Sequence, residues 1–199
     1  LKPQVATPVL AELAPLLGAG QIVVSMMAGV PTARIEELLP EGTPVVRVMP
    51  QTLVRLRAAA CALSAGRAAS GEQLALVRSL FDLVGTTVEV AESQMDAVTG
   101  LSGSGPAWAY TVIEALIDGG VRSGLPREVA TKLAAQTLSG AARLVLESGE
   151  HPAVLKDQVT SPGGTTIAGL HVLEEKGLRD ALISAVQAAA RRSAELGQA

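Results

Sequence analysis

The sequence predicts an α/β domain followed by an all-α domain, and two observations support this prediction. Up to about residue 90, short β-branched runs alternate with helical patterns, which is typical of a parallel or mixed sheet covered by helices. From about residue 91 the β-branched runs stop and only helical patterns remain. We therefore expect residues 1–90 to form an α/β domain and residues 91–199 a helical domain.

In the first part, four short runs predict strands and three helical patterns accompany them. The strands are expected at residues 21–26, 44–49, 58–64 and 86–90, and the helices at 7–17, 32–39 and 70–84. Thr32 is expected to cap the second of these helices and Ser70 the third. The apolar face of the third helix is expected to consist of Leu74, Val77, Leu80, Phe81 and Val84.

The second part is expected to contain five helices. They are predicted at residues 107–121, 126–148, 151–159, 164–176 and 178–196. The Gly-rich stretch 100–107 is expected to be a domain hinge, because it lacks the lysine of a phosphate-binding P-loop. The helical faces are rich in Ala and Gly, which indicates close helix–helix packing. A helical domain this short and apolar is expected to finish burying its surface in a dimer.

Composition excludes several classes of function. The chain has 199 residues, of which 18% are charged, and a net charge of −3, so it has no basic surface for nucleic acid. No apolar run reaches the roughly 18–20 residues that span a bilayer, and no signal segment opens the sequence. A single cysteine, Cys61, excludes an internal disulfide and fits a reducing compartment. We expect a cytoplasmic protein that binds neither nucleic acid nor membrane.

Nucleophilic and metal chemistry find little support in the sequence. Cys61 has no nearby His or Asp and is expected to be an inert residue of a strand. His151 and His171 lie far apart, without an HExxH motif or clustered carboxylates, so no metal site is expected.

One segment, Val159 to Thr166 with the sequence VTSPGGTT, combines a proline, two glycines and four hydroxyls between two helical patterns. The Pro-Gly-Gly run breaks regular structure and leaves backbone N–H groups unpaired. The N-terminus of the following helix is a natural seat for a small anion such as a carboxylate. The alternative is a plain turn between two helices.

A second candidate lies at Met26 and Met27. They come at the end of an expected strand, where open α/β sheets bind ligands, although methionines also serve as core filler. Lys2 stands where another strand could end, and the alternative there is a solvated end of the chain.

Taken together, the motifs of the chain closely resemble those of pyrroline-5-carboxylate reductase. The resemblance rests on DAVTGLSGSGPA at 96–107, GLPR at 124–127, HP at 151–152, LKD at 155–157 and VTSPGGTT at 159–166. Weaker support comes from KP at 2–3, AGV at 28–30 and RVMP at 47–50. The resemblance covers essentially the whole chain, and the combination of motifs is highly specific.

The resemblance implies a partial Rossmann-type NAD(P)-binding domain followed by a helical dimerisation domain. It implies reduction of (S)-1-pyrroline-5-carboxylate to L-proline with NADPH or NADH, the last step of proline biosynthesis. It also implies a homodimer through the helical domain, with higher oligomers such as a decamer possible in the family. The printed sequence lacks the GxGxxG region that holds the cofactor pyrophosphate in this family, so it resembles an N-terminally truncated member.

The family pattern also assigns roles to individual residues. The cofactor would lie near Lys2, Pro3, Met26, Met27, Ala28 and Gln158. The substrate would lie among Glu92, Ser161, Gly163, Gly164, Thr165 and Thr166. Thr166 would be the catalytic residue, because its hydroxyl can orient the imine nitrogen and relay a proton.

Two other functions remain open at the level of sequence. Without the GxGxxG region, the chain could be a non-catalytic dimerisation module. A dehydrogenase of the 6-phosphogluconate type would use a lysine of the second domain as acid and base. Lys132, Lys156 and Lys176 are available for that role, but none lies in that family's motif.

Overall fold

The computed structural model describes residues 6–198, and the side chains of residues 7–197. By packing, the chain divides into two compact units, Leu1–Pro106 together with Ser184–Ala199, and Ala107–Ile183. We call them the sheet unit and the helical unit. This division follows contacts alone, and the domain boundary near residue 90 stays a prediction.

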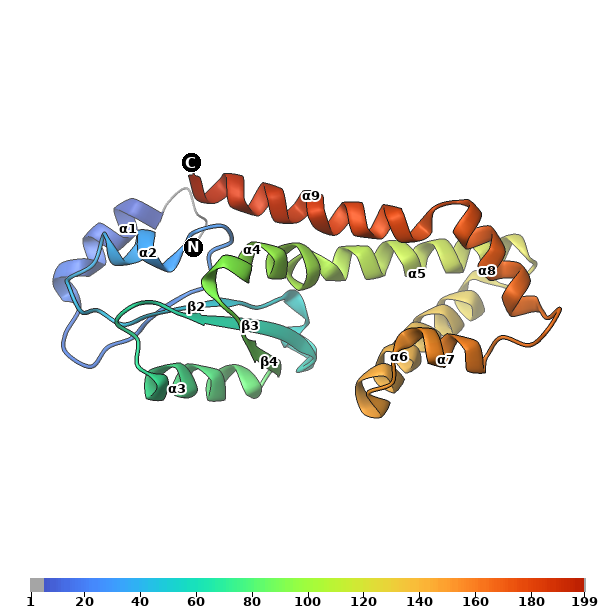
Figure 1. The fold of residues 1–199 in the computed structure, drawn as a ribbon, viewed down its shortest axis with the longest axis horizontal. Helices are drawn as coiled ribbons and strands as arrows, with labels where there is room; N and C mark the ends of the chain where they lie inside the picture. Colours follow the sequence, from blue (N-terminus) through green and yellow to red (C-terminus); the bar gives the residue numbers. More distant parts are fainter. Residues whose placement is uncertain (1–5, 199) are drawn as a thin grey trace. The chain divides into compact units, whose positions relative to one another are not determined.

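A four-stranded mixed sheet forms the centre of the sheet unit (Figure 1). The strands β1 (Val23–Ser25), β2 (Val45–Met49), β3 (Ala59–Ala65) and β4 (Gly85–Glu89) lie side by side in that order. β1 is parallel to β2 and β3 is parallel to β4, whereas β2 and β3 are antiparallel. All four strands and the mixed sheet were expected from the sequence.

Short helices connect and cover these strands. They are α1 (Ala6–Leu13), α2 (Thr32–Glu36), α3 (Gly71–Asp82) and α4 (Met95–Val98), with 3-10 turns η2 (Ala14–Leu16), η3 (Thr52–Leu56) and η4 (Glu92–Gln94). A π-helix, η5 (Thr99–Gly103), follows α4. Because β2 is buried along its whole length, these elements cover both of its faces.

Successive side chains of β2 point to opposite faces of the sheet, so the core has a part on each face. Val45 packs in a cluster with Ile35 of α2, and both side chains are fully buried. Val46 and Val48 point the other way and pack with Val77 of α3. The sheet unit therefore has a core on each side of the central strand.

The predicted cap of α3 is confirmed, and that of α2 is wrong. Ser70 accepts the Gln73 N–H at 3.2 Å, and the Gln73 side chain accepts the Ser70 N–H at 2.8 Å, which completes a capping box. Thr32 is instead the first residue of α2, and the capping position belongs to Pro31. One predicted core residue of α3 also differs, since Leu80 is 56% exposed.

The five expected helices of the second part are present. They are α5 (Gly105–Arg122), α6 (Arg127–Ser148), α7 (Pro152–Gln158), α8 (Thr165–Glu175) and α9 (Leu178–Gln198). The sequence of α9 belongs to both units, because its residues from Ser184 onward pack in the sheet unit.

The stretch 100–107, expected to be a domain hinge, is helical, and the boundary between the two units falls within it, between Pro106 and Ala107. Thr99–Gly103 continues α4 as a π-helix, and α5 begins at Gly105. Gly100 lies against the backbone of α9 at Val186 and Ala190, so a side chain at this position would collide with it. Gly100 therefore allows the close packing of this segment against α9.

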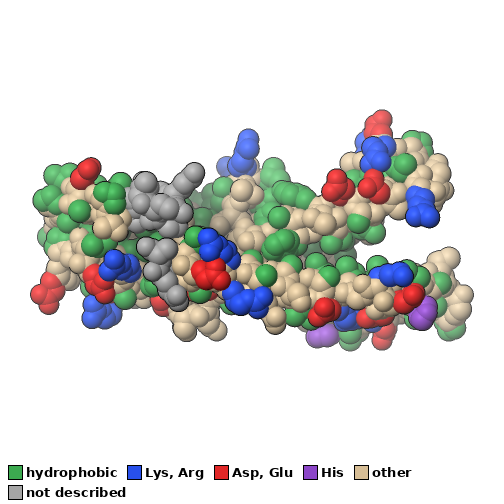
Figure 2. Space-filling model, turned by 90° about the horizontal axis from the view of Figure 1, so that it is seen from above, with side chains coloured by type: hydrophobic (Ala, Val, Ile, Leu, Met, Phe, Trp, Pro, Cys, Tyr) green, Lys and Arg blue, Asp and Glu red, His purple; other side chains and the backbone are tan. Residues whose placement is uncertain are grey.

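Apolar side chains reach the surface in many places, as the space-filling view shows (Figure 2). Exposed leucines include Leu146 at 82%, Leu56 at 76% and Leu16 at 74%. Within residues 6–198, no helix combines the length and apolar character needed to cross a membrane.

Candidate active site

The segment Val159–Thr166 forms a closed turn between α7 and α8. The Thr160 N–H donates to the Asp157 carbonyl at 3.0 Å, and the Gly164 N–H donates to the Ser161 carbonyl at 3.1 Å. The Thr160 hydroxyl donates to the Lys156 carbonyl at 2.7 Å, so it is committed to the end of α7.

Both glycines of this turn are required by local geometry. Gly163 has φ of +66°, a left-handed conformation that a side chain would strain. At Gly164 a Cβ atom would collide with the Ser161 hydroxyl. The turn therefore keeps the Ser161 side chain close to the backbone at the start of α8.

The N-terminus of α8 is open to a ligand. Its capping residue, Gly164, has no side chain to accept a hydrogen bond, and the first turn contains no acidic residue. The first N–H groups of a helix have no intrahelical acceptor, and the helix dipole adds positive potential there. Thr165 is exposed and Thr166 is half-buried, so both hydroxyls lie at this open end. The arrangement can bind a small carboxylate and orient a second polar group beside it.

α7 leads into this turn and is fixed at both ends. His151 caps it, since its Nδ1 accepts the Ala153 N–H at 3.2 Å. Gln158 donates from Nε2 to Glu150 Oε2 at 3.1 Å, which joins the last residue of the helix to the residue before its cap. The Gln158 amide, expected near the cofactor, is thus held in place within the helical unit.

The two methionines after β1 lie in different environments. Met26 is 55% exposed, whereas Met27 is 5% exposed and packs in the core with Ile35. Ala28 is partly buried beside Met49 and Met95. Lys2 and Pro3, also expected near the cofactor, lie outside the described residues.

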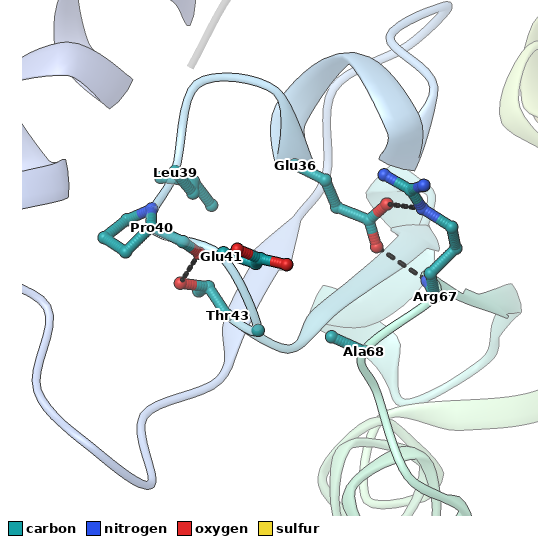
Figure 3. Close-up of a pocket in the computed structure, with 8 residues that line it drawn as sticks. Glu36, Leu39, Pro40, Glu41, Thr43, Arg67 and Ala68 are labelled. Carbon is teal, nitrogen blue, oxygen red and sulfur yellow. Dashed lines mark hydrogen bonds and ion pairs between the residues drawn. The ribbon is translucent and has the colours of Figure 1, made fainter.

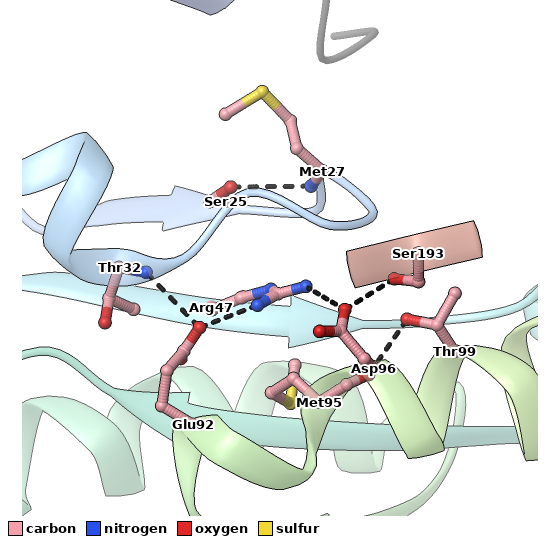
Figure 4. Close-up of polar contacts among 9 residues, drawn as sticks. All are labelled: Ser25, Met27, Thr32, Arg47, Glu92, Met95, Asp96, Thr99 and Ser193. Carbon is pink, nitrogen blue, oxygen red and sulfur yellow. Dashed lines mark hydrogen bonds and ion pairs between the residues drawn. The ribbon is translucent and has the colours of Figure 1, made fainter. Parts of the chain in front are cut away.

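A buried cluster of charged groups lies in the sheet unit (Figure 4). Arg47, in the middle of β2, has a side chain that is only 2% exposed. Its Nη1 donates to Glu92 Oε1 at 2.6 Å, and its Nη2 lies 3.9 Å from Asp96 Oδ1. Glu92 Oε1 also accepts the Thr32 N–H at 3.3 Å, and the Ser193 hydroxyl donates to Asp96 Oδ1 at 2.6 Å. We call these five residues the Arg47 cluster.

Three buried atoms of the Arg47 cluster have no hydrogen-bond partner: Arg47 Nε, Arg47 Nη2 and Glu92 Oε2. A buried polar group without a hydrogen-bond partner destabilises the folded protein by about 1–3 kcal/mol, so three such atoms in one cluster are unusual. Sequence reasoning named Glu92 but missed Arg47, Asp96 and Ser193. The available signal was an arginine within the apolar run VVRVM, where a charge is out of place unless it is paired.

Two other features of the sheet unit lie outside the candidate site. A cavity of about 510 Å³ borders the Glu36–Arg67 ion pair (Figure 3). Arg67 Nε lies 3.2 Å from Glu36 Oε2, and the Arg67 backbone N–H donates to Glu36 Oε1 at 2.6 Å. Burial raises the pKa of the Cys61 thiol, and the negative charge of Asp82 adds to this effect. Cys61 is therefore a protonated core residue of β3, in agreement with the inert role expected for it.

The fold corresponds to a known class of two-part oxidoreductases. A family model described as pyrroline-5-carboxylate reductase dimerisation matches residues 92–196. A solved structure from Plasmodium falciparum, a pyrroline carboxylate reductase with NADP bound, superimposes with a TM-score of 0.92 at 33% identity. The superposition covers 99% of this chain and 79% of the other. The class is thus that of NAD(P)H-dependent reductases with an α/β part and a helical dimerisation part.

The curated relatives define the family. The pyrroline-5-carboxylate reductase of Methanosarcina acetivorans is 50% identical over 198 residues, which is 100% of this chain and 73% of the relative. That of Synechocystis is 52% identical over 199 residues, again 100% of this chain and 73% of the relative. The chain belongs to the pyrroline-5-carboxylate reductase family.

Proposed function

We propose that this protein reduces (S)-1-pyrroline-5-carboxylate to L-proline with NADPH or NADH, the last step of proline biosynthesis, in the cytoplasm. One observation supports this assignment most strongly. In this member of the family, the hydroxyls of Thr165 and Thr166 lie at the open N-terminus of α8, directly after the Gly163-Gly164 turn. This arrangement suits a small substrate with one carboxylate and one neighbouring nitrogen.

The carboxylate of the substrate is assigned to the start of α8. Its oxygens would accept from the unpaired N–H groups of the first turn, which also supplies the positive end of the helix dipole. Gly163 and Gly164 keep the backbone free of side chains there, and Ser161 and Thr165 add hydroxyl donors. Removing the carboxylate from water costs free energy, and several aligned N–H and O–H donors offset this cost.

The nitrogen of the substrate is assigned to Thr166. Hydride addition to the imine carbon turns this nitrogen into an amine, so a group that orients it and handles its proton favours the reaction. A threonine hydroxyl is a weak acid, and the proton therefore originates from water or is already present on the imine. The role of Thr166 is to hold the nitrogen and relay that proton.

The cofactor is assigned to the carboxyl end of β1 and to the other residues that the family pattern names. The exposed thioether of Met26 and the open edge after the strand fit a flat nicotinamide ring, and Met27 and Ala28 support the loop from the core side. Lys2, Pro3 and Gln158 complete the proposed set. When bound, the reduced nicotinamide supplies the hydride. The protein contributes by positioning, since reacting atoms must come within about 3–3.5 Å.

The helical part is assigned to dimerisation. We propose that residues 1–90 form the Rossmann-type part and residues 91–199 the helical part, through which two copies associate. Side chains such as Leu133, Leu144 and Leu146 are half or more exposed on α6 and offer apolar surface for a second copy. Light scattering at known concentration would distinguish a dimer from a larger assembly such as a decamer.

A substrate comparison tests the proposed function. NADPH and NADH oxidation is followed by absorbance with pyrroline-5-carboxylate, and separately NADP⁺ reduction with 6-phosphogluconate. We expect turnover with the imino acid alone. Turnover with the hydroxy acid alone, or with neither compound, would remove the assignment. Titration with NADPH in the absence of substrate would separate a protein that lacks cofactor binding from one that lacks substrate binding.

A further inference from the structure

The loop that follows β1 is anchored on both sides of its one exposed side chain. The Ser25 hydroxyl accepts the Met27 N–H at 3.4 Å, and the Met27 side chain is buried in the core (Figure 4). Further along the loop, Val30 is buried as well. Met26 differs from these residues, because it is 55% exposed directly after the last residue of β1. The loop therefore presents a single exposed thioether on a fixed backbone.

The last turns of α9 lie directly against this loop, and both segments belong to the sheet unit. Gly29 has φ of +77°, and a Cβ atom there would collide with the Ser193 carbonyl oxygen. A Cβ atom at Gly197 would collide in turn with the Gly29 carbonyl oxygen. The two glycines thus permit a contact between the backbone of the loop and the backbone of α9.

The end of α9 is itself held on the sheet unit by further contacts. Ser193 is buried, and its hydroxyl donates to Asp96 Oδ1 at 2.6 Å. Earlier in α9, the backbone at Val186 and Ala190 lies against Gly100. These contacts make the end of α9 a firm support for the loop after β1.

We infer that Gly197 is a positioning residue for cofactor binding, and that it acts through Met26. Its contact with Gly29 fixes the backbone of the loop, and the loop fixes the thioether on which the nicotinamide ring lies. The inference rests on the proposed function, in which Met26 contacts the cofactor. All residues that it invokes lie in the sheet unit.

The physical properties of the methionine side chain explain why such a support is needed. Methionine is unbranched and flexible, so its thioether offers a defined surface only when the backbone beneath it is fixed. Contacts with a flat ring depend on dispersion, which falls by a quarter to a half when the gap widens by about 0.5–1 Å. A loop that shifts by this amount would hold the nicotinamide ring less tightly.

The substitution Gly197→Ala tests the inference. At an open position of a helix, alanine is more favourable than glycine, so a loss at this position would come from the contact with Gly29. We expect the dissociation constant for NADPH, measured by calorimetry, to rise about ten-fold. Gly71→Ala is the matched control, because a Cβ atom at this first residue of α3 meets nothing within 4 Å. The control should bind NADPH as the unaltered protein does.

A double-mutant cycle shows whether Gly197 acts through Met26. In the Met26→Ala background, Gly197→Ala should weaken NADPH binding by less than about two-fold, because the side chain that it positions is already absent. A glycine that supports the fold alone would weaken binding by the same factor in both backgrounds. That result, or unchanged affinity of Gly197→Ala, would overturn the inference.

A spectroscopic measurement without cofactor tests the structural part of the inference. The chain contains four methionines, so NMR of protein labelled with ¹³C at the methionine methyl groups gives few signals, and Met26→Ala assigns that of Met26. Gly197→Ala should shift the Met26 signal, whereas Gly71→Ala should leave it in place. A Met26 signal that Gly197→Ala does not move would overturn the inference.

A second variant covers the case in which Gly197→Ala does not fold, as judged by circular dichroism. Ser193→Ala removes the hydrogen bond to Asp96 without adding an atom, and we expect a loss of NADPH affinity of about three-fold that disappears with Met26→Ala. If the unaltered protein reduces pyrroline-5-carboxylate but the cycle is additive, the inference alone fails. If it neither binds NADPH nor reduces the imino acid, the proposed function and the inference both fail.

Discussion

The two units of this protein bury their apolar residues to very different extents. In the sheet unit, Val45, Val46 and Val48 are fully buried, and cores lie on both faces of β2. Among residues 107–183, the buried hydrophobic residues are Ala130 and Ala134 alone. The sheet unit thus completes its own core, whereas the helical unit does not.

This difference indicates where the helical unit finds its remaining stability. Its helices are apolar enough to need a partner, and a dimerisation family model matches residues 92–196. Small contacts such as Gly120 against Ala130 let α5 and α6 approach closely but bury little area. The outward faces then remain for a second copy. Four predictions test this contrast between the two units and the roles assigned within them.

The largest effect is expected from a cavity in the sheet unit. Ile35→Ala removes a fully buried side chain and should lower the free energy of unfolding by about 2–5 kcal/mol. Leu146→Ala, at a site that is 82% exposed, should change it by less than about 0.5 kcal/mol. Urea unfolding measures both at protein concentrations low enough to keep the chain monomeric, because Leu146 belongs to the surface assigned to a second copy. Similar losses at the two sites would contradict the contrast between the units.

The second largest effect is expected from a substitution of Thr166, which should lower the reductase activity without changing the free energy of unfolding. Thr166→Ala should lower kcat for pyrroline-5-carboxylate on the order of 100-fold, because the hydroxyl that orients the nitrogen is lost. Cofactor affinity should change much less. Thr160→Ala is the matched control, since the Thr160 hydroxyl donates to the Lys156 carbonyl and has no assigned part in the reaction. Equal activity of Thr166→Ala and the unaltered protein would remove the role given to Thr166.

Alkaline pH should weaken the sheet unit through Cys61. Burial raises the pKa of this thiol above its ordinary value of 9.0, so the folded protein keeps a proton that the unfolded chain releases. The free energy of unfolding should therefore fall as pH rises above about 9, by at most about 1.4 kcal/mol per pH unit. Comparison with Cys61→Ala isolates this contribution. If both proteins lose stability in parallel between pH 8 and 10, burial of the thiol has no such effect.

The smallest effects concern helix caps in the two units. Ser70→Ala removes the capping box of α3 and should lower the free energy of unfolding by about 1 kcal/mol. His151→Ala removes an exposed cap of the shorter helix α7, so its effect should be smaller and confined to local fraying. Thermal unfolding compares the two variants. A larger loss for His151→Ala would show that α7 contributes more to global stability than the comparison of the units allows.

Sequence patterns were sufficient where structure is local. Helix α3 was predictable because its apolar spacing is regular and Ser70 and Gln73 lie within its own first turn. The strands β2 and β3 were predictable from short apolar runs, and the period change after β4 indicated the helical part. The turn at Val159–Thr166 was predictable because glycine and proline act on the backbone directly.

Long-range pairing could not be predicted in the same way. Thr32 was expected to cap α2, but the acceptor for its own N–H is Glu92, 60 residues further along. The partner of Arg47 is 45 residues away, and Asp96 pairs with Ser193 at a separation of 97. The contact of Gly100 with α9 could not be predicted, because nothing nearby in sequence reveals that α9 packs against it. Each of these features depends on tertiary contacts.

The central claim is that the turn at residues 161–166 binds the carboxylate of the substrate, and amide hydrogen exchange tests it most directly. Exchange is measured in the protein alone and in the presence of saturating L-proline with NADP⁺. We expect L-proline to slow exchange at the first N–H groups of α8, at Thr165 and Thr166, while the amides of the exposed end of α6 remain unchanged. L-proline that binds without slowing exchange at the start of α8 would contradict the account.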